Sequence, residues 1–147
     1  MNSILILYQK IISSFINKPV IKVITGMRRV GKSCLLKLVI EETLSNNIGK
    51  DKILYINKES LEYDFIMNYK DLYDYVKKRF RNIKGPKYLF VDEIQEIDLW
   101  EKAVTSFFSQ ENIDIFITGS NANLLSSELP TLLSGGYVEI PVCSLGF

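Results

Sequence analysis

The amino-acid sequence predicts an α/β fold with five strands, and two observations favour this fold class. Short runs rich in β-branched residues alternate with longer segments of helical periodicity along the chain, and this alternation is typical of α/β proteins. The 147 residues include 47% hydrophobic and 24% charged residues, a usual globular composition that excludes a disordered or fibrous chain. We therefore expect one domain over residues 1–147.

The first half of the chain predicts two helices and two strands. Residues 3–15 have apolar side chains at helical spacing, and an Asn-Lys-Pro sequence ends this helix. Residues 20–25 form a β-branched run that indicates a buried strand. A glycine-bounded loop leads from it into a second helix, which ends near residues 45–49. Residues 52–57 are the second strand, and residues 58–67 form a loop with some helix. The apolar stripe of the first helix comprises Ile4, Leu7, Ile11 and Phe15.

The second half predicts two further helices and three strands. Residues 68–82 carry one apolar stripe and end before a Gly-Pro sequence. Residues 87–91 form the third strand, and residues 113–118 form the fourth strand after an intervening helix. A short helical stretch follows residue 121, and residues 137–140 form the fifth strand. The apolar stripes are Tyr69, Leu72, Val76 and Phe80 in the first of these helices, and Trp100, Val104, Phe107 and Phe108 in the second.

The charge balance and the counts of histidine and cysteine exclude several kinds of function. Lys and Arg total 18 against 17 for Asp and Glu, so the net charge of +1 gives no electrostatic reason to expect nucleic acid or an anionic membrane as the main partner. The absence of histidine excludes Ser-His-Asp catalysis and histidine-ligated zinc. Cys34 and Cys143 are too few for a disulfide framework or a four-thiolate metal site. Without a long apolar run or an export signal, we expect a cytoplasmic location.

Residues 26–33 match the G-x-x-x-x-G-K-[ST] pattern of a phosphate-binding loop completely. Glycines permit backbone angles that point successive N–H groups at phosphate oxygens, and the start of the following helix adds a positive dipole. In such a loop Lys32 neutralises β- and γ-phosphate charge, and the Ser33 hydroxyl binds Mg²⁺. The expected strand before the motif and helix after it supply the context that the pattern requires. The expected nucleotide-binding residues are Gly26, Met27, Arg28, Arg29, Val30, Gly31, Lys32, Ser33 and Cys34.

Three of these side chains have more than one interpretation. Arg28 and Arg29 either contact the nucleotide or a neighbouring subunit, or they are solvated charges on an exposed loop. Cys34 follows Ser33 in the first helical turn, where a thiol can have a lowered pKa. We favour the alternative that Cys34 is a small packing residue beside the nucleotide.

The apolar run of residues 88–91 is followed directly by Asp92 and Glu93. An acidic residue at the carboxyl end of a parallel strand lies on the same sheet edge as the phosphate loop. We therefore expect Asp92 to hold the Mg²⁺ shell, and Glu93 to orient or polarise the water that attacks the γ-phosphate. The pattern is weak alone, because strands often end in solvated charges, and it gains specificity from the phosphate loop that precedes it.

Another expected strand separates the phosphate loop from Asp92, so their two strands are not consecutive. We expect the fourth strand to lie between them in the sheet. Its end then lies beside the γ-phosphate, where Ser120 and Asn121 are candidate polar sensors that bond phosphate or the attacking water. A Gly-Ser-Asn turn that caps the next helix needs the same residue types, and the sequence does not separate these two interpretations.

Together these residues resemble the AAA+ ATPases, and more narrowly the prokaryotic AAA family ATPases with a C-terminal domain of unknown function. The matching stretches are residues 23–33, residues 88–95 with Trp100-Glu101, and residues 117–121 with 124–129. The resemblance implies a three-layer P-loop NTPase core with a mostly parallel sheet in the order 5-1-4-3-2. It also implies ATP as the ligand, Mg²⁺ as the cofactor and oligomers in which a neighbour completes the active site. The loop before the first strand, residues 17–19, would then lie near the adenine.

Two features depart from the pattern of this family. Its members usually have an arginine after the glycine that precedes Tyr137, whereas this chain has Gly135-Gly136. Relatives also continue into a helical lid and the C-terminal domain, so we expect residues 1–147 to form an AAA+ type core that ends before the lid. A missing arginine lowers the rate at such sites by roughly 10³ to 10⁵, which predicts tight nucleotide binding with slow turnover.

The leading hypothesis is therefore an ATP-binding core that hydrolyses ATP slowly in isolation, and the alternative is a nucleotide-responsive binding module without effective hydrolysis. A small-molecule kinase would need an acceptor site and an arginine-rich lid, and we see no such segment. DNA binding through the basic residues 77–81 is a weaker alternative, because such a cluster beside acidic residues is more often a solvated face. Expected partners are ATP or ADP and a further protein chain. The expected catalytic residues are Lys32, Glu93, Ser120 and Asn121, and the expected metal ligands are Ser33 and Asp92.

Overall fold

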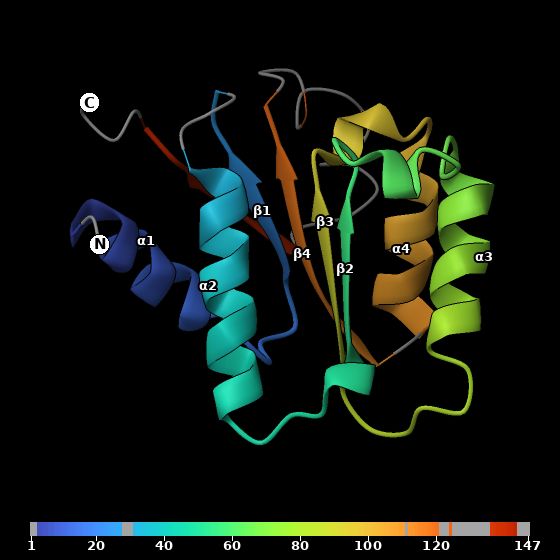
Figure 1. Ribbon diagram of the computed structural model, residues 1–147, viewed down its shortest axis with the longest axis horizontal. Coiled ribbons are helices and arrows are strands. Elements are labelled where there is room, and N and C mark those ends of the chain that lie inside the picture. Colours follow the sequence, from blue (N-terminus) through green and yellow to red (C-terminus); the bar gives the residue numbers. More distant parts are fainter. Residues whose placement is uncertain (1–2, 28–30, 111, 121–123, 125–135, 144–147) are drawn as a thin grey trace.

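Five strands form one parallel sheet in the computed structural model of the protein (Figure 1). The structure describes residues 3–27, 31–110, 112–120, 124 and 136–143. The strand order is β2-β3-β4-β1-β5, and every neighbouring pair is parallel. Read from the other edge this is the order 5-1-4-3-2, so the predicted sheet is confirmed, including the insertion of the fourth strand between the first and the third. The strands are β1 (Ile21–Thr25), β2 (Ile53–Asn57), β3 (Lys87–Asp92), β4 (Ile113–Gly119) and β5 (Tyr137–Pro141).

Helices cover both faces of this sheet, as the predicted three-layer fold requires. Figure 1 shows α1 and α2 on one face and α3 and α4 on the other. No helix among the described residues has both the length and the apolar character needed to cross a bilayer. The helices are α1 (Ser3–Ser13), α2 (Lys32–Ser45), α3 (Tyr69–Arg79) and α4 (Trp100–Gln110), and short 3-10 turns form η1 (Lys50–Lys52), η2 (Leu61–Tyr63) and η3 (Ile94–Glu96).

The strands are apolar on both faces because both faces are buried. On β3, Leu89 and Val91 belong to the core under α3 and α4, whereas Tyr88 and Phe90 belong to the core under α1 and α2. Successive side chains of a strand point to opposite faces, so a sheet covered on both sides needs nearly continuous apolar strands. The predicted stripes of α3 and α4 are also confirmed, since their buried members include Leu72, Val76, Phe80, Trp100, Val104 and Phe107.

The first helix forms where it was predicted, but the apolar stripe identified from the sequence is its more exposed side. Leu5 and Ile12 are buried in the core under α1 and α2. By contrast Ile4, Leu7 and Ile11 are 43%, 58% and 40% exposed. The helix begins with an Ile-Leu-Ile-Leu run, so more than one of its faces is apolar. Periodicity alone cannot choose between such faces.

Candidate functional site

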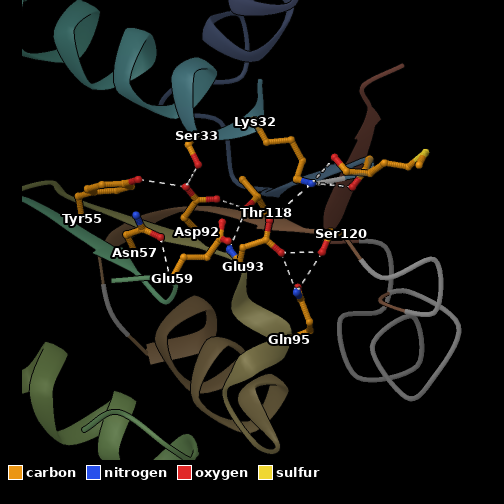
Figure 2. A network of polar contacts seen from close by, with 12 residues as sticks. Lys32, Ser33, Tyr55, Asn57, Glu59, Asp92, Glu93, Gln95, Thr118 and Ser120 are labelled. Carbon is orange, nitrogen blue, oxygen red and sulfur yellow. Dashed lines mark hydrogen bonds and ion pairs between the residues drawn. The ribbon is translucent and has the colours of Figure 1, made fainter. Parts of the chain in front are cut away.

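The ends of three strands and the start of α2 meet at the carboxyl edge of the sheet (Figure 2). The register pairs Val91 of β3 with Ile117 of β4, and Thr25 of β1 with Gly119 of β4. The carboxyl ends of parallel strands lie at the same edge of a sheet. The phosphate loop after β1, Asp92 at the end of β3 and the end of β4 therefore come together, although they are far apart in the sequence.

Lys32 begins α2 with its side chain turned back over the phosphate loop. Gly26 and Gly31 have φ values of 152° and 97°, in a region that glycine adopts without steric cost. The Lys32 amine, on a side chain only 3% exposed, donates to the carbonyl oxygens of Gly26 at 2.6 Å and Met27 at 3.0 Å. A buried ammonium held by neutral carbonyls can exchange them for a phosphate, because charge-assisted bonds are stronger. With the helix N-terminus beside it, this arrangement suits an anion.

The carboxylate of Asp92 is fully buried and accepts hydrogen bonds from hydroxyl groups on three elements. Ser33 of α2 donates to Oδ2, Tyr55 of β2 donates to Oδ2 at 3.0 Å, and Thr118 of β4 donates to Oδ1 at 2.5 Å. Burial and the negative charge of Asp92 raise the pKa of the Tyr55 hydroxyl, which keeps it protonated as a donor. Such donors offset the desolvation of a buried carboxylate, and they hold it facing the first turn of α2.

Glu93 follows β3 with its backbone in the left-handed region, at φ 57° and ψ 55°. This conformation is uncommon for a residue with a side chain and costs about 1–3 kcal/mol. It is supported by the Glu93 N–H, which donates to Thr118 Oγ1 at 2.9 Å. The Glu93 carboxylate accepts hydrogen bonds at Oε1 from Gln95 at 2.7 Å and Ser120 at 2.8 Å, and its Oε2 lies 3.6 Å from the Lys32 amine. The turn thus directs this carboxylate toward the phosphate loop.

A cavity of about 360 Å³ opens beside these groups. Among the described residues, no group of three or more cysteine, aspartate or glutamate side chains is arranged to hold a metal ion. Mg²⁺ does not need such a group, because one or two carboxylates with substrate phosphates and water usually bind it. The Ser33 hydroxyl donates a hydrogen bond to the Asp92 carboxylate. Both groups present oxygen atoms of the kind that Mg²⁺ prefers as ligands, so they fit this ion. The cavity is lined by Gly31, Lys32, Ser33, Cys34, Glu59 and Glu93.

Most of the predicted site residues lie in this region. Cys34 is exposed and lines the cavity, and its packing beside the nucleotide stays a prediction. The predicted residues joined by contacts are Gly26, Met27, Lys32, Ser33, Asp92, Glu93 and Ser120. Arg28, Arg29, Val30, Asn121, Gly135 and the helical stretch expected after Asn121 lie outside the described residues, apart from Leu124.

Three residues of this network were missed in the sequence. Tyr55 lies on β2, Thr118 on β4 and Gln95 on η3, and each bonds directly to Asp92 or Glu93. Tyrosine and threonine are common in strands, so neither stands out as polar until the register of the sheet is known. A usable signal was the position of Thr118, next to the strand end already expected beside the γ-phosphate.

A second network of buried charge lies at the amino edge of the sheet. The fully buried Lys22 of β1 forms an ion pair with Asp114 of β4, and it also donates to the Lys18 carbonyl oxygen at 2.9 Å. The N–H of Asn17 donates to the other Asp114 oxygen at 2.7 Å. Burial lowers the pKa of Lys22 and raises the pKa of Asp114, while their mutual attraction opposes both shifts. These charges are satisfied within the protein.

Residues 17–19 lie beside this pair, and their expected place near the adenine stays a prediction. They line a different cavity, of about 480 Å³, together with Asp114. That cavity lies at the start of β1, whereas the phosphate loop follows its end, and the 5 residues of β1 span roughly 16 Å. The loop before a strand lies at the sheet edge opposite to the loop after it, so residues 17–19 do not line the cavity at Lys32.

The sequence of residues 18–147 matches the family model of the AAA domain. A protein of Haemophilus influenzae, described only as uncharacterized, is 41% identical over 140 residues. That match covers 95% of this chain and 35% of the Haemophilus protein. The chain therefore spans about a third of the length of this curated relative.

Solved structures share the fold at low sequence identity. The structure of Drosophila ORC bound to DNA matches with a TM-score of 0.62 and 18% identity, over 99% of this chain and 94% of that chain. A Walker-type ATPase of Pyrococcus abyssi matches with a TM-score of 0.60 and 15% identity, over 92% of this chain and 52% of that chain. At these identities the likeness shows a common fold.

Proposed function

Since the chain belongs to the AAA domain family, we propose that it binds ATP with Mg²⁺ at the carboxyl edge of the sheet and hydrolyses ATP there by attack of water on the γ-phosphate. The observation that carries the proposal is the hydrogen bond from Ser33 to Asp92. It joins the helix that follows the phosphate loop to the strand end that carries the acidic residues. Phosphoryl transfer requires phosphate-binding and metal-binding groups at one point.

The phosphate loop and the start of α2 bind the phosphates of the nucleotide. Lys32 exchanges the carbonyl oxygens of Gly26 and Met27 for β- and γ-phosphate oxygens, and the N–H groups at the start of α2 add further donors. Ser33 and Asp92 hold Mg²⁺, which neutralises charge on the phosphates when it is bound. The preformed bond between these two side chains supports that assignment.

Glu93 is the proton acceptor. It takes a proton from the attacking water while the new oxygen–phosphorus bond forms and the bond from the γ-phosphorus to the bridging oxygen breaks, which releases ADP and phosphate. The 3.6 Å separation of Glu93 from Lys32 supports this role. Ser120, bonded to Glu93, and Asn121 are the proposed polar sensors. We expect slow turnover because Gly136 stands where the family usually has an arginine.

ATPase rates of the wild type and of Glu93→Gln test hydrolysis. Loss of a general base lowers the rate by roughly 10² to 10⁴, so we expect at least a hundredfold loss while Mg-ATP binding persists. Glu62→Gln, an exposed position on η2, is the matched control and should keep the wild-type rate. Equal rates in wild type and Glu93→Gln would remove Glu93 from the mechanism and favour a nucleotide-responsive binding module.

The role of the whole protein is a wider proposal, because the chain spans about a third of its Haemophilus relative. We propose that residues 1–147 are the ATP-binding core of a prokaryotic-type ATPase whose further C-terminal domain contacts a partner or a second copy. The 41% identity to a bacterial protein supports this narrower assignment. Lys77, Lys78 and Arg79 on α3 are exposed, which suits a solvated face, so we do not propose DNA as the partner. A cytoplasmic location stays a prediction.

A further inference from the structure

Gln95 lies on η3, two residues after Glu93, and its side chain points back into the site (Figure 2). Its amide donates to Glu93 Oε1 at 2.7 Å and to Ser120 Oγ at 3.3 Å. Ser120 in turn donates to the same Glu93 oxygen at 2.8 Å. Three side chains from η3, the end of β3 and the end of β4 therefore form a closed set of hydrogen bonds around a single carboxylate oxygen.

The partners determine the orientation of the Gln95 amide. A carboxylate only accepts hydrogen bonds, and the hydroxyl proton of Ser120 is already directed to it. The NH₂ group must therefore face both Glu93 and Ser120. The carbonyl oxygen of Gln95 points away from them, and it is buried without a hydrogen-bond partner among the described residues. It lies 3.0 Å from the point where a Cβ on Gly119 would stand, so little space is left for the side chain to turn.

We propose that Gln95 is a positioning residue that fixes the Glu93 carboxylate and selects which of its oxygens meets the attacking water, an inference that rests on the proposed hydrolysis. With Oε1 held by Gln95 and Ser120, rotation of the carboxylate would break two hydrogen bonds. Oε2 is the oxygen on the side of Lys32, and Glu93 lines the cavity with Lys32. Oε2 is thus the oxygen that accepts the proton.

Gln95→Met is the sharpest test, because it removes the amide and keeps the length of the side chain. The charged groups that face Glu93 are Lys32 across the site, Asp92 at the preceding position and Glu59 in the same cavity, and all three stay unchanged. With one donor lost, the carboxylate is free to turn away from the orientation that Gln95 and Ser120 impose. We expect kcat to fall roughly 10- to 100-fold while the dissociation constant of Mg-ATP changes less than about twofold. A purely structural loss would not separate kcat from binding in this way.

The chain offers a matched control in Gln9→Met. Gln9 of α1 also donates its amide to a glutamate, Glu42 of α2, at 3.1 Å. The same substitution therefore removes the same kind of contact in a different part of the fold. Gln9→Met should leave kcat as in the wild type.

A measurement that needs no turnover separates this inference from the proposed function. In protein labelled with ¹³C-glutamate, the Glu93 carboxyl signal (assigned through Glu93→Gln) should shift and broaden at one fixed pH in Gln95→Met relative to wild type, because the carboxylate loses one of the two donors that hold Oε1. Identical signals in the two proteins overturn the inference, whether or not the wild type hydrolyses ATP. A lower melting temperature with an unchanged signal also overturns it, because Gln95 would then be only structural. Absence of hydrolysis in the wild type contradicts the proposed function alone.

Discussion

The two edges of the sheet each bury a lysine and a carboxylate, but they satisfy them in different ways. At the amino edge, Lys22 and Asp114 form an ion pair. Lys22 also donates to a backbone carbonyl oxygen, and Asp114 also accepts from a backbone N–H. At the carboxyl edge, the shortest bonds of Lys32 go to neutral carbonyl oxygens, and Glu93 lies 3.6 Å away. The charges at the amino edge therefore pair with groups of the protein itself, whereas the contacts of Lys32 at the carboxyl edge are ones that a ligand can replace.

Buried charge and cavity size therefore do not identify the functional site by themselves. The larger cavity, about 480 Å³, lies at the amino edge, and the cavity of about 360 Å³ lies beside the phosphate loop. The carboxyl edge differs because the hydrogen bonds of Lys32 go to carbonyl oxygens while its ion pair with Glu93 is longer, at 3.6 Å, and because the buried carbonyl oxygen of Gln95 has no partner among the described residues. Replaceable partners mark a binding site more clearly than burial does.

The largest effect is expected from Lys22→Met at the amino edge. This change leaves Asp114 buried without its cation, and breaking a buried ion pair in this way costs about 3–5 kcal/mol. Urea unfolding measures the loss. The double variant Lys22→Met with Asp114→Leu should recover most of the stability, because an apolar pair replaces the ionic one. A loss of stability below about 1 kcal/mol would contradict the interpretation of this network as a closed, buried pair.

The second largest effect is expected from Lys32→Ala at the carboxyl edge. Mg-ATP at about 100 times its dissociation constant should stabilise the wild type by about 2.7 kcal/mol, which raises the melting temperature by several degrees. Lys32→Ala should lose this shift at the same nucleotide concentration, whereas Lys22→Met should keep it despite its lower melting temperature. If the two lysine variants respond alike to the nucleotide, the distinction between the edges fails.

Thr118→Val tests the centre of the carboxyl edge. The hydroxyl of Thr118 donates to Asp92 and accepts from the Glu93 N–H, so its loss leaves buried groups unpaired and costs about 1–3 kcal/mol. Thr43→Val is a matched control, because Thr43 is also buried and its hydroxyl donates only to Val39 of its own helix. Chemical denaturation should show a larger loss for Thr118→Val. Equal losses in the two variants would mean that Thr118 does not support the site.

The smallest effect is expected from Tyr55→Phe. Asp92 keeps its bonds from Ser33 and Thr118, so the loss should be about 1 kcal/mol. Tyr88→Phe removes a comparable hydroxyl at the amino edge, where Tyr88 donates to Asn17 at 2.8 Å. Both variants should lose similar stability, but only Tyr55→Phe should change the Mg²⁺ concentration required for nucleotide binding in a titration. An effect of Tyr88→Phe on Mg²⁺ dependence would contradict the separation of the two edges.

The strands, and the placement of Lys32 and Ser33 at the carboxyl edge, were predictable because their signals are local. Residues 88–91 are continuously apolar since both faces of the sheet are covered, and residues 26–33 carry a complete motif. The buried face of α1 was not predictable, because Leu5 and Ile12 compete with an equally apolar stripe, and only packing against α2 decides between them. The placement of residues 17–19 opposite the phosphate loop follows from the order of the chain, because the loops before and after a strand lie at opposite edges of the sheet.

The rest of the site depends on non-local geometry. Tyr55 reaches Asp92 because β2 pairs with β3, and Thr118 reaches it because β4 lies on the other side. Gln95 meets Glu93 only because the backbone of Glu93 is left-handed. None of these three relations follows from the spacing of residues along the chain. The register of the sheet and the φ angle of Glu93 determine which of these residues meet.

The central place of β4 has a consequence for when the candidate site can assemble during synthesis. Ser33 and Asp92 are separated by 59 positions. The strand β4, which lies between β1 before the phosphate loop and β3 with Asp92, is made after both of them. A nascent chain that has emerged only as far as residue 112 has every acidic and basic group of the site but no strand to join its halves. Insertion of β4 is a long-range step, and such steps are slow because the closure entropy of the intervening chain comes first. We therefore expect the proposed nucleotide site to assemble only after β4 has joined the sheet.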